Sequence, residues 1–227
     1  MYGPGVRLFY ILLVPLRNST PGGVLLIRFG PSGIPLSCKG RTPRDGIEDV
    51  HTLGLNSMEI QFVRVNIFDR YATEEEVGLS PVDMEGELIV DVMRYVSDDE
   101  VEPVWEKDLS IVEGDILRIL TCGIGKDFNE LKETGRLARE LDVELSLHTP
   151  YYMDLGGDED ISMRSLNNVV YGGLIADALG AGVVVTHMGL YGDLDSGEAT
   201  EEVIEKMEFL TEKFRARKVK ARIGLET

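Results

Sequence analysis

Three short apolar segments of the chain each end in a side chain that can bind a metal ion. These side chains belong to His148, His187 and Glu226, and consecutive members are 39 residues apart. Two imidazoles and a carboxylate are a donor set typical of zinc. The chain has only three histidines, and two of them stand at such segment ends. One such histidine alone could equally be a hydrogen-bonded polar residue at the edge of a core, but the shared spacing favours a common cation.

Parallel β-strands separated by helices would bring these side chains together. Leucine-rich and β-branched runs predict strands over 143–147, 182–186 and 221–225. The spacing corresponds to about one strand–helix unit with generous loops. In a (β/α) barrel the carboxyl ends of the strands meet at one rim, where such folds carry their active sites. We therefore expect the three side chains to converge at that rim.

The same alternation extends upstream and defines the fold class. Strands are predicted over 25–29 and 57–63, and further helices are predicted to begin at Asp127, near 161 and near 198. Between the first two strands, Thr42-Pro43-Arg44-Asp45 predicts an N-cap, a first-turn proline and an acidic N3 residue. The buried stripe of that helix is predicted to comprise Ile47, Val50 and Leu53. The fold class is α/β, a partial (β/α)8 TIM barrel with about five of its eight strands.

Two regions depart from the alternation. Residues 66–126 form a predicted small β-rich insertion after the second strand, with Leu88, Val90 and Val92 alternating as in a half-exposed strand. Residues 1–23 contain turn-forming prolines and glycines and an apolar run, 8–13, that is too short to span a membrane. We expect 1–23 to be an extension outside the fold, with a secretion signal as the alternative, and 24–227 to be the barrel domain. Because complete barrels need roughly 250 residues, we expect this domain to be truncated at its C-terminus.

Charge and cysteine content narrow the class of protein. The formal net charge is −17, which favours solubility and argues against a broad, non-specific grip on nucleic acid. The two cysteines, Cys38 and Cys122, are 84 positions apart and form neither a disulfide framework nor a zinc ribbon. These features favour a reducing, cytoplasmic setting and no membrane association.

Four short motifs resemble the endonuclease IV family within the xylose-isomerase-like barrels. They are the run 27–35 (IRFGPSGIP), the run 148–152 (HTPYY), the run 186–189 (THMG) and the run 224–227 (GLET). Each motif is short, but their order and their placement at strand ends agree with that family. The resemblance covers 24–227 apart from the insertion.

The resemblance implies an apurinic/apyrimidinic endonuclease of base-excision repair. Such a hydrolase uses a zinc cluster to cut the phosphodiester on the 5′ side of an abasic nucleotide in double-stranded DNA. By position, His148 and His187 resemble ligands of one zinc ion, and Glu226 resembles the catalytic carboxylate that bridges two. The family's remaining aspartate, histidine and glutamate ligands come from later strands that are absent here, so a single or partial zinc site is expected. Met188 replaces a proline that is common after this histidine, which affects the loop more than the ligand.

Further residues are candidate DNA contacts. Tyr151, three residues after the first histidine, is similar to the aromatic residue with which this family probes the lesion; the alternative is a tyrosine packed in its loop. Lys39, Arg41 and Arg44 lie in and just after the loop that follows the first strand, where they could contact phosphates. A solvated basic loop without a partner is the alternative for these three.

Two other functions stay open from the sequence. One is a sugar isomerase or epimerase of the same barrel type, in which a metal held by histidine and glutamate polarises a carbonyl. The other is a remnant without catalytic activity. His51, within the first helix, is interpreted as structural, and Cys122-Gly123-Ile124-Gly125 as a turn without chemistry.

Overall fold

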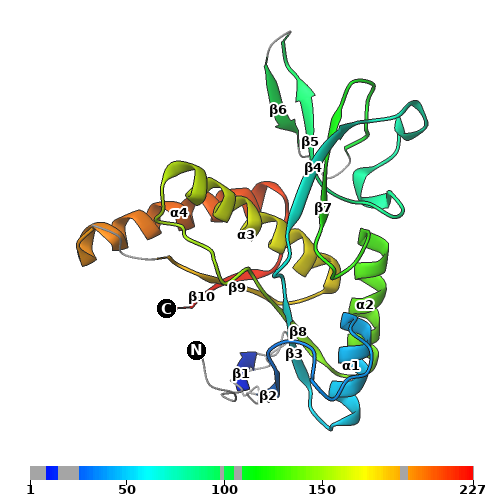
Figure 1. The fold of residues 1–227 in the computed structure, drawn as a ribbon, viewed down its shortest axis with the longest axis vertical. Helices are drawn as coiled ribbons and strands as arrows, with labels where there is room; N and C mark the ends of the chain where they lie inside the picture. The colour runs from blue at the N-terminus through cyan, green and yellow to red at the C-terminus, as the bar shows by residue number, and fades with distance from the viewer. Residues whose placement is uncertain (1–8, 15–25, 98–99, 105–108, 190–193, 227) are drawn as a thin grey trace, which may run out of the picture.

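The structure is a computed structural model, and it describes residues 9–14, 26–97, 100–104, 109–189 and 194–226. Figure 1 shows a mixed α/β arrangement from which a second, antiparallel sheet projects. The strands are β1 (Phe9–Val14), β2 (Leu26–Pro31), β3 (Ser57–Gln61), β4 (Asn66–Tyr71), β5 (Leu88–Tyr95), β6 (Val101–Val104), β7 (Ile116–Thr121), β8 (Glu144–His148), β9 (Val183–His187) and β10 (Arg222–Glu226). The helices are α1 (Pro43–Thr52), η1 (Glu74–Glu76), η2 (Pro81–Asp83), α2 (Phe128–Glu140), α3 (Glu159–Leu179) and α4 (Ser196–Ala216).

A parallel sheet with the order β10-β9-β8-β3 forms the barrel portion of the fold. Helix α1 precedes β3, α2 precedes β8, α3 joins β8 to β9 and α4 joins β9 to β10. Sequential strands are therefore neighbours, as in a (β/α) barrel, and the predicted α/β fold class is confirmed. The sheet of the described residues has four strands where we predicted five. The residue that follows β2, Ser32, reaches this sheet through an isolated parallel bridge to Glu59.

The predicted first strand has an additional partner. β2 pairs along its whole length with β1 in an antiparallel two-stranded sheet. Residues 1–23 are predicted to lie outside the barrel domain, because their prolines and glycines indicate turns. Within that segment the structure describes β1, whose backbone pairs with β2. The domain boundary at residue 24 stays a prediction.

Helix α1 begins with the predicted signals. The Thr42 hydroxyl accepts a hydrogen bond from the Asp45 backbone N–H, the Asp45 carboxylate accepts one from the Thr42 N–H, and Pro43 occupies the first turn. This capping box satisfies donors that a helix end leaves free. Ile47 and Val50 are buried as predicted, whereas Leu53 is 54% exposed. Leu53 was assigned wrongly because it is the C-cap residue, where the chain leaves the helical path that keeps the stripe on one face.

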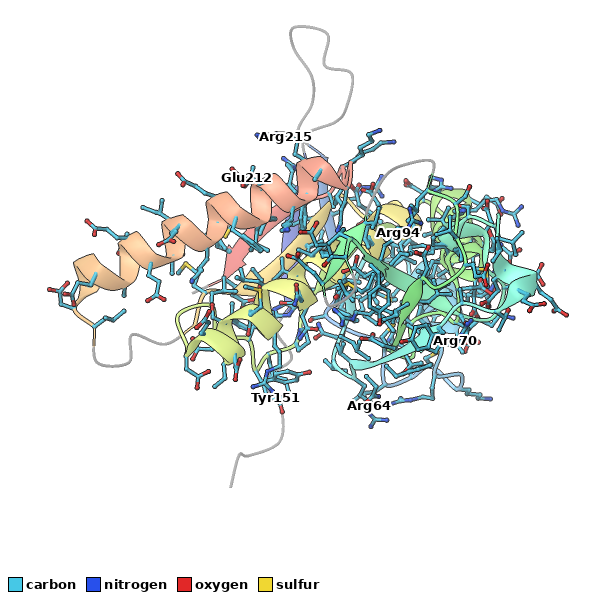
Figure 2. All side chains as sticks on the ribbon, turned by 90° about the horizontal axis from the view of Figure 1, so that it is seen from above. Arg64, Arg70, Arg94, Tyr151, Glu212 and Arg215 are labelled. Carbon is cyan, nitrogen blue, oxygen red and sulfur yellow. The ribbon has the colours of Figure 1, made fainter. Side chains whose placement is uncertain are left out.

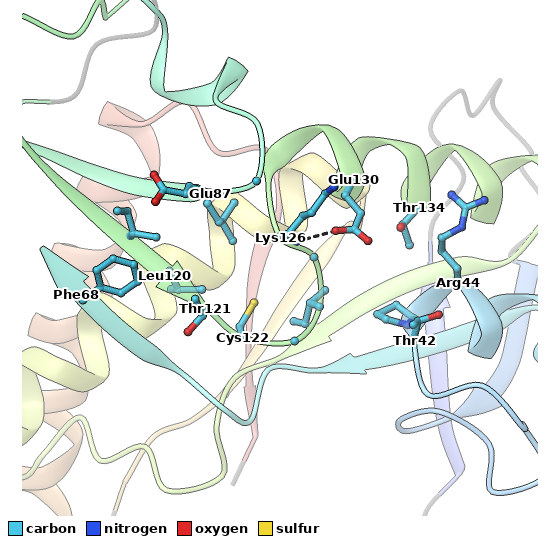
Figure 3. A pocket seen from close by; sticks show the side chains of 17 residues that line it. Thr42, Arg44, Phe68, Glu87, Leu120, Thr121, Cys122, Lys126, Glu130 and Thr134 are labelled. Carbon is cyan, nitrogen blue, oxygen red and sulfur yellow. Dashed lines mark hydrogen bonds between the residues drawn. The ribbon is translucent and has the colours of Figure 1, made fainter. Parts of the chain in front are cut away.

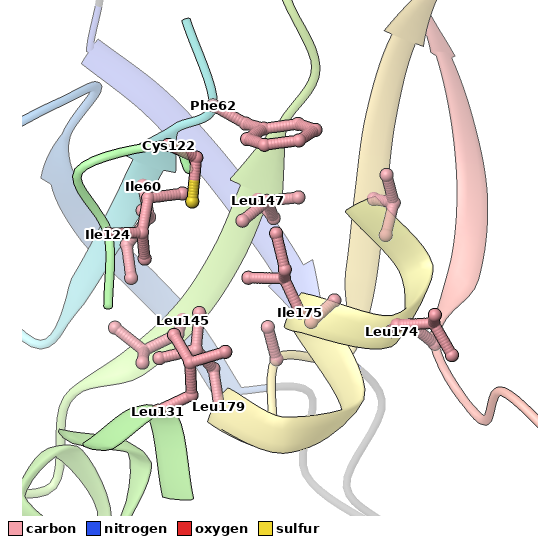
Figure 4. Packing of buried hydrophobic residues seen from close by; sticks show 14 of the residues in the cluster. Ile60, Phe62, Cys122, Ile124, Leu131, Leu145, Leu147, Leu174, Ile175 and Leu179 are labelled. Atoms are coloured by element: carbon pink, nitrogen blue, oxygen red, sulfur yellow. The ribbon is translucent and has the colours of Figure 1, made fainter. Parts of the chain in front are cut away.

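The main core lies between the parallel sheet and the helices. Figure 4 shows Ile60, Leu145 and Leu147 of the sheet packed close to Ile175 and Leu179 of α3, with Cys122 and Ile124 also in the cluster. In each strand these apolar residues alternate with polar ones, because successive side chains of a strand point to opposite faces. The face turned away from the helices therefore carries Glu59, Gln61, Ser146 and His148.

The insertion is a separate antiparallel sheet with the order β4-β7-β5-β6. Strand β5 was predicted to be half-exposed, but all residues from Leu88 to Val92 are buried. Both faces of β5 are covered: Leu88 and Val90 lie in the main core, whereas Ile89 and Val92 pack in the insertion's own core. A β-bulge between Ile89 and Asp91 places Asp91 opposite Arg118, and Asp91 forms a buried ion pair with Arg217 at the end of α4. Figure 2 shows how densely side chains fill this part of the molecule around Arg70 and Arg94. No helix among the described residues is long and apolar enough to cross a membrane.

Candidate metal centre

Three strand ends of the parallel sheet bring His148, His187 and Glu226 together. These residues, hereafter the strand-end cluster, close β8, β9 and β10, and Glu226 lies beside His187 in the ladder. One ligand atom from each residue can be chosen so that all three lie within 4.8 Å of one another. His148 is buried, while His187 and Glu226 are half-buried. The cluster is the only group of this kind among the described residues.

The imidazole of His148 is held from both sides. Its Nδ1 lies 2.6 Å from the carbonyl oxygen of Thr149, and its Nε2 lies 2.9 Å from Oε2 of Glu226. A carbonyl oxygen can only accept, so Nδ1 carries the proton and Nε2 of the neutral ring presents a lone pair. That lone pair then faces a carboxylate oxygen, and the two repel unless a proton or a metal ion lies between them. An ion pair with a protonated imidazole and a shared metal ion would each remove this repulsion.

The donor set and its dimensions fit zinc. Bonds of roughly 2.0–2.1 Å in a tetrahedral site put neighbouring donor atoms about 3.4 Å apart. The 2.9 Å contact is somewhat shorter than that distance, and all three donor atoms lie within 4.8 Å of one another. The two imidazole rings, with centroids 5.1 Å apart and planes inclined by 59°, do not stack against each other and can both direct a nitrogen to one ion. Three protein donors leave a fourth position open, as in catalytic zinc sites.

A buried carboxylate beside the cluster was missed by sequence analysis. Glu59 of β3 is 5% exposed and lies on the same face of the sheet as His148. It accepts hydrogen bonds from Ser32 and Gln61. An acidic residue within the apolar strand 57–63 was the available signal, because ionised groups are rarely buried without a specific partner.

The loop after β8 presents two aromatic rings. Tyr151 is 75% exposed, so it is not packed in its loop, and its ring meets that of Tyr152 edge-on with centroids 5.6 Å apart. Arg64, in the segment that follows β3, is also exposed and was not considered in the sequence analysis. Figure 2 shows Arg64 and Tyr151 projecting from the same side of the molecule. The residue type and the strand-end location were the signals that could have identified Arg64.

The structure places the predicted basic residues at the surface. Lys39, Arg41 and Arg44 are exposed, and no ion pair joins them to the other described residues. Arg44 also lines a cavity of about 480 Å³ between α1, the start of α2 and the insertion sheet, shown in Figure 3 with Phe68 and Cys122. None of the residues lining this cavity belongs to the strand-end cluster. Arg44 therefore lines a concave surface that is distinct from the strand-end cluster.

The remaining histidine and the buried cysteine stand outside the cluster. Nδ1 of His51 lies 2.9 Å from the carbonyl oxygen of Leu141, which connects α1 to the end of α2. Burial raises the pKa of the Cys122 thiol, and backbone N–H groups of Ile124 and Gly125 oppose this only in part. A thiol with a raised pKa is a poor nucleophile.

Comparison with known proteins supports the fold. Residues 120–227 match the family described as "Xylose isomerase-like TIM barrel", and this segment contains the whole strand-end cluster. The parallel sheet and the helices that connect its strands have the α/β arrangement of a partial barrel, in agreement with this match. No curated protein matches the chain.

Similar solved structures include three proteins. Endonuclease IV from Thermus thermophilus is 16% identical with a TM-score of 0.38, covering 79% of this chain and 47% of that one. SacUVDE is 20% identical with a TM-score of 0.37, covering 44% and 33%. The TTHB071 protein, also from Thermus thermophilus and from crystals soaked with ZnCl2, is 25% identical with a TM-score of 0.34, covering 43% and 39%. The chain spans less than half the length of each of these proteins.

Proposed function

We propose that this chain is a zinc-dependent DNA repair endonuclease of endonuclease IV type, which hydrolyses the phosphodiester on the 5′ side of an abasic site. The observation that carries the proposal is the convergence of His148, His187 and Glu226 at the ends of three neighbouring strands. The sequence motifs that resemble the endonuclease IV family run through the same strand ends. The family described for residues 120–227 is compatible with this proposal but is broader than it.

In this proposal each member of the cluster has a defined role. His148 and His187 would hold a zinc ion through ring nitrogens, and the Thr149 carbonyl fixes the His148 tautomer that presents Nε2 as the ligand. Glu226 would act as the catalytic carboxylate and as a further ligand of the metal site. When bound, zinc supplies positive charge to the phosphate and activates water at neutral pH.

DNA contacts are assigned to side chains around the rim. Tyr151, exposed at the end of β8, is proposed to probe the gap left by the missing base, since a ring can stack where a base is absent. Lys39, Arg41, Arg44 and, in addition, Arg64 are proposed phosphate contacts, because each is exposed and outside the ion pairs of the described residues. An abasic nucleotide lacks the stacking of a base, so turning it out of the duplex costs less than flipping an intact nucleotide.

The negative charge of the chain is concentrated away from the strand ends, which permits DNA binding there. Residues 66–126 contain sixteen acidic and five basic residues, so the insertion carries most of the net charge of −17. The insertion strands belong to a sheet separate from the one that ends in the cluster. We propose that DNA is bound at the rim and not along the insertion, where phosphates would be repelled.

An incision assay tests the proposal. Zinc-loaded protein is incubated with a labelled duplex that contains one abasic site, and the product ends are analysed. We expect a cut 5′ to the lesion that leaves a 3′-hydroxyl, loss of activity in Glu226→Gln and retention of activity in His51→Ala. Incision that is equal in wild-type protein and Glu226→Gln would contradict the role of the cluster.

A sugar isomerase or epimerase is the second candidate. The observation that favours it is the polar face next to the cluster, where the accessible side chains of Ser32 and Gln61 could meet hydroxyl groups. Turnover of aldoses and ketoses by the zinc-loaded protein, without incision of abasic DNA, would establish this alternative. A protein that binds no zinc and shows neither activity would be a remnant without catalytic function.

A further inference from the structure

A buried carboxylate without a cationic partner lies beside the strand-end cluster. Glu59 is 5% exposed, and its Oε1 accepts hydrogen bonds from Ser32 Oγ at 2.7 Å and from Gln61 Nε2 at 3.2 Å. Its Oε2 lies 3.5 Å from Ser146 Oγ. No ion pair joins Glu59 to a lysine or arginine within the described ranges. Burying a carboxylate among neutral groups costs free energy of folding. This cost suggests that Glu59 has a role in function and not only in packing.

The charge of Glu59 determines which way the Gln61 amide faces. Besides its bond to Glu59, Nε2 of Gln61 donates to Ser32 Oγ at 2.7 Å. If the amide were reversed, its oxygen would face the carboxylate of Glu59, and the two acceptors would repel. The amide nitrogen therefore points to Glu59 and Ser32. The carbonyl oxygen Oε1 lies on the other side of the amide, and it has no hydrogen-bond partner in the part of the chain that the structure describes.

Gln61 stands next to a member of the cluster. In the parallel ladder Gln61 is the register partner of His148, and Glu59 is that of Ser146. Register partners on adjacent strands lie roughly 4.8 Å apart and point to the same face. A substrate that occupies the strand-end cluster therefore comes within reach of the Gln61 side chain, which is half-buried at the last position of β3.

We propose that Glu59 is a positioning residue that fixes the Gln61 amide, so that its carbonyl oxygen accepts a hydrogen bond from a sugar hydroxyl of the substrate. The inference rests on the proposed function and specifies the group that is recognised. Phosphate-diester oxygens carry no proton and would be repelled by a carbonyl oxygen, so the partner must be a donor. In an abasic nucleotide such a donor exists at C1′, where a hydroxyl replaces the base. A free sugar would offer the same chemistry.

The experiment compares two lesions in otherwise identical duplexes. One contains a natural abasic deoxyribose, and the other contains a tetrahydrofuran residue that lacks the C1′ hydroxyl. One hydrogen bond corresponds to about five- to tenfold in rate, so we expect wild-type kcat/KM to favour the natural lesion by about that factor. Gln61→Leu removes the acceptor and should make the two lesions equivalent. Glu59→Gln allows the amide to reverse and should reduce the preference in part.

Ser146→Ala is the matched control. Ser146 lies near Glu59 Oε2 but has no hydrogen bond to Gln61. The Ser146→Ala protein should retain the wild-type preference for the natural lesion over tetrahydrofuran. All variants should retain wild-type zinc content and cooperative thermal unfolding. If Gln61→Leu folds and keeps the wild-type preference, or if Ser146→Ala loses it as completely as Glu59→Gln does, the inference is wrong.

A second readout does not depend on DNA incision. The side-chain NH2 of Gln61, identified in NMR spectra by its loss in Gln61→Leu, should exchange slowly with solvent in wild-type protein and in Ser146→Ala. Glu59→Gln should accelerate this exchange by about tenfold or more, because a charge-assisted hydrogen bond is lost. Fast exchange in the wild-type protein would overturn the positioning role.

The two proposals fail in different ways. If the wild-type protein incises neither duplex, the proposed function is wrong, and the recognised hydroxyl must belong to a free sugar. Titration calorimetry of the zinc-loaded protein with D-xylose then decides: binding that Gln61→Leu weakens about fivefold supports the inference. Unchanged binding in Gln61→Leu, or no binding, overturns it.

Discussion

Replacing Arg217 by methionine should destabilise the protein strongly, because it leaves a carboxylate buried without its partner. Arg217 is the C-cap of α4, and its guanidinium lies 3.1 Å from Asp91 Oδ1 and donates a hydrogen bond of 2.8 Å to the Val90 carbonyl. The two side chains are only 8% and 7% exposed. Removing one partner of a buried ion pair typically costs about 3–5 kcal/mol. We expect a decrease of that size in the free energy of unfolding, measured by urea denaturation at pH 7.

The double variant Asp91→Asn/Arg217→Met separates the ion pair from general packing. It should be more stable than Arg217→Met alone, because the neutral amide avoids the buried charge. Burial raises the pKa of Asp91, and Arg217 opposes this increase. Without Arg217 the pKa should rise further, so the folded variant gains stability as the pH falls from 7 toward the ordinary carboxyl range and loses it as the pH rises. A cost below about 1 kcal/mol for Arg217→Met, or a double variant less stable than the single one, would refute this reasoning.

Three further predictions concern stability. Gly135→Ala places a Cβ 2.1 Å from the Leu179 carbonyl oxygen, so α2 and α3 must separate, and the free energy of unfolding should decrease by about 1–3 kcal/mol. Gly182→Ala is the control and should change stability little, because a Cβ there meets nothing within 4 Å. Arg70 holds the pKa of Glu76 at about 2 against an ordinary value of 4.5, so the pair's contribution is complete above pH 4.5 and is lost as the pH falls toward 2. In Glu76→Gln, the free energy of unfolding should therefore decrease by about 1 kcal/mol less than in wild type when the pH falls from 4.5 to 2. This value is modest because solvent screens the pair, and Glu75→Gln should behave like wild type. Thr42→Ala removes the side-chain cap of α1 and should lower the free energy of unfolding by about 1 kcal/mol in the same urea assay; an unchanged midpoint would contradict the role of the capping box.

The elements that position the cluster could be predicted because their signals are local. The start of α1 is indicated by Thr42, Pro43 and Asp45, which lie within four residues of one another. The start of α2 is indicated by Asp127, whose carboxylate accepts a hydrogen bond from the backbone N–H of Glu130. Leucine-rich and β-branched runs located β8, β9 and β10 to within one residue at each end. Once the strands are parallel and adjacent, the convergence of their last side chains follows from the geometry of the sheet.

Other features depend on contacts between distant segments, which periodicity does not encode. Strand β5 resembled a half-exposed strand because Asp91 interrupts its apolar pattern, yet Asp91 is buried by Arg217, 126 positions away. The pairing of β1 with β2 requires a partner outside the predicted domain. Glu59 was missed because its partners Ser32 and Gln61 are ordinary residues whose proximity arises only when β2 and β3 come together.

The most direct test of the central claim is the zinc content of three purified proteins. Wild-type chain, His187→Ala and His51→Ala are each loaded with zinc, freed of excess metal and measured by elemental analysis. We expect one zinc ion per chain in wild-type protein and in His51→Ala, since His51 contacts the Leu141 carbonyl far from the cluster in the sequence. His187→Ala should lose most of its zinc. Equal zinc content in all three proteins would contradict the assignment of the strand-end cluster as a metal centre.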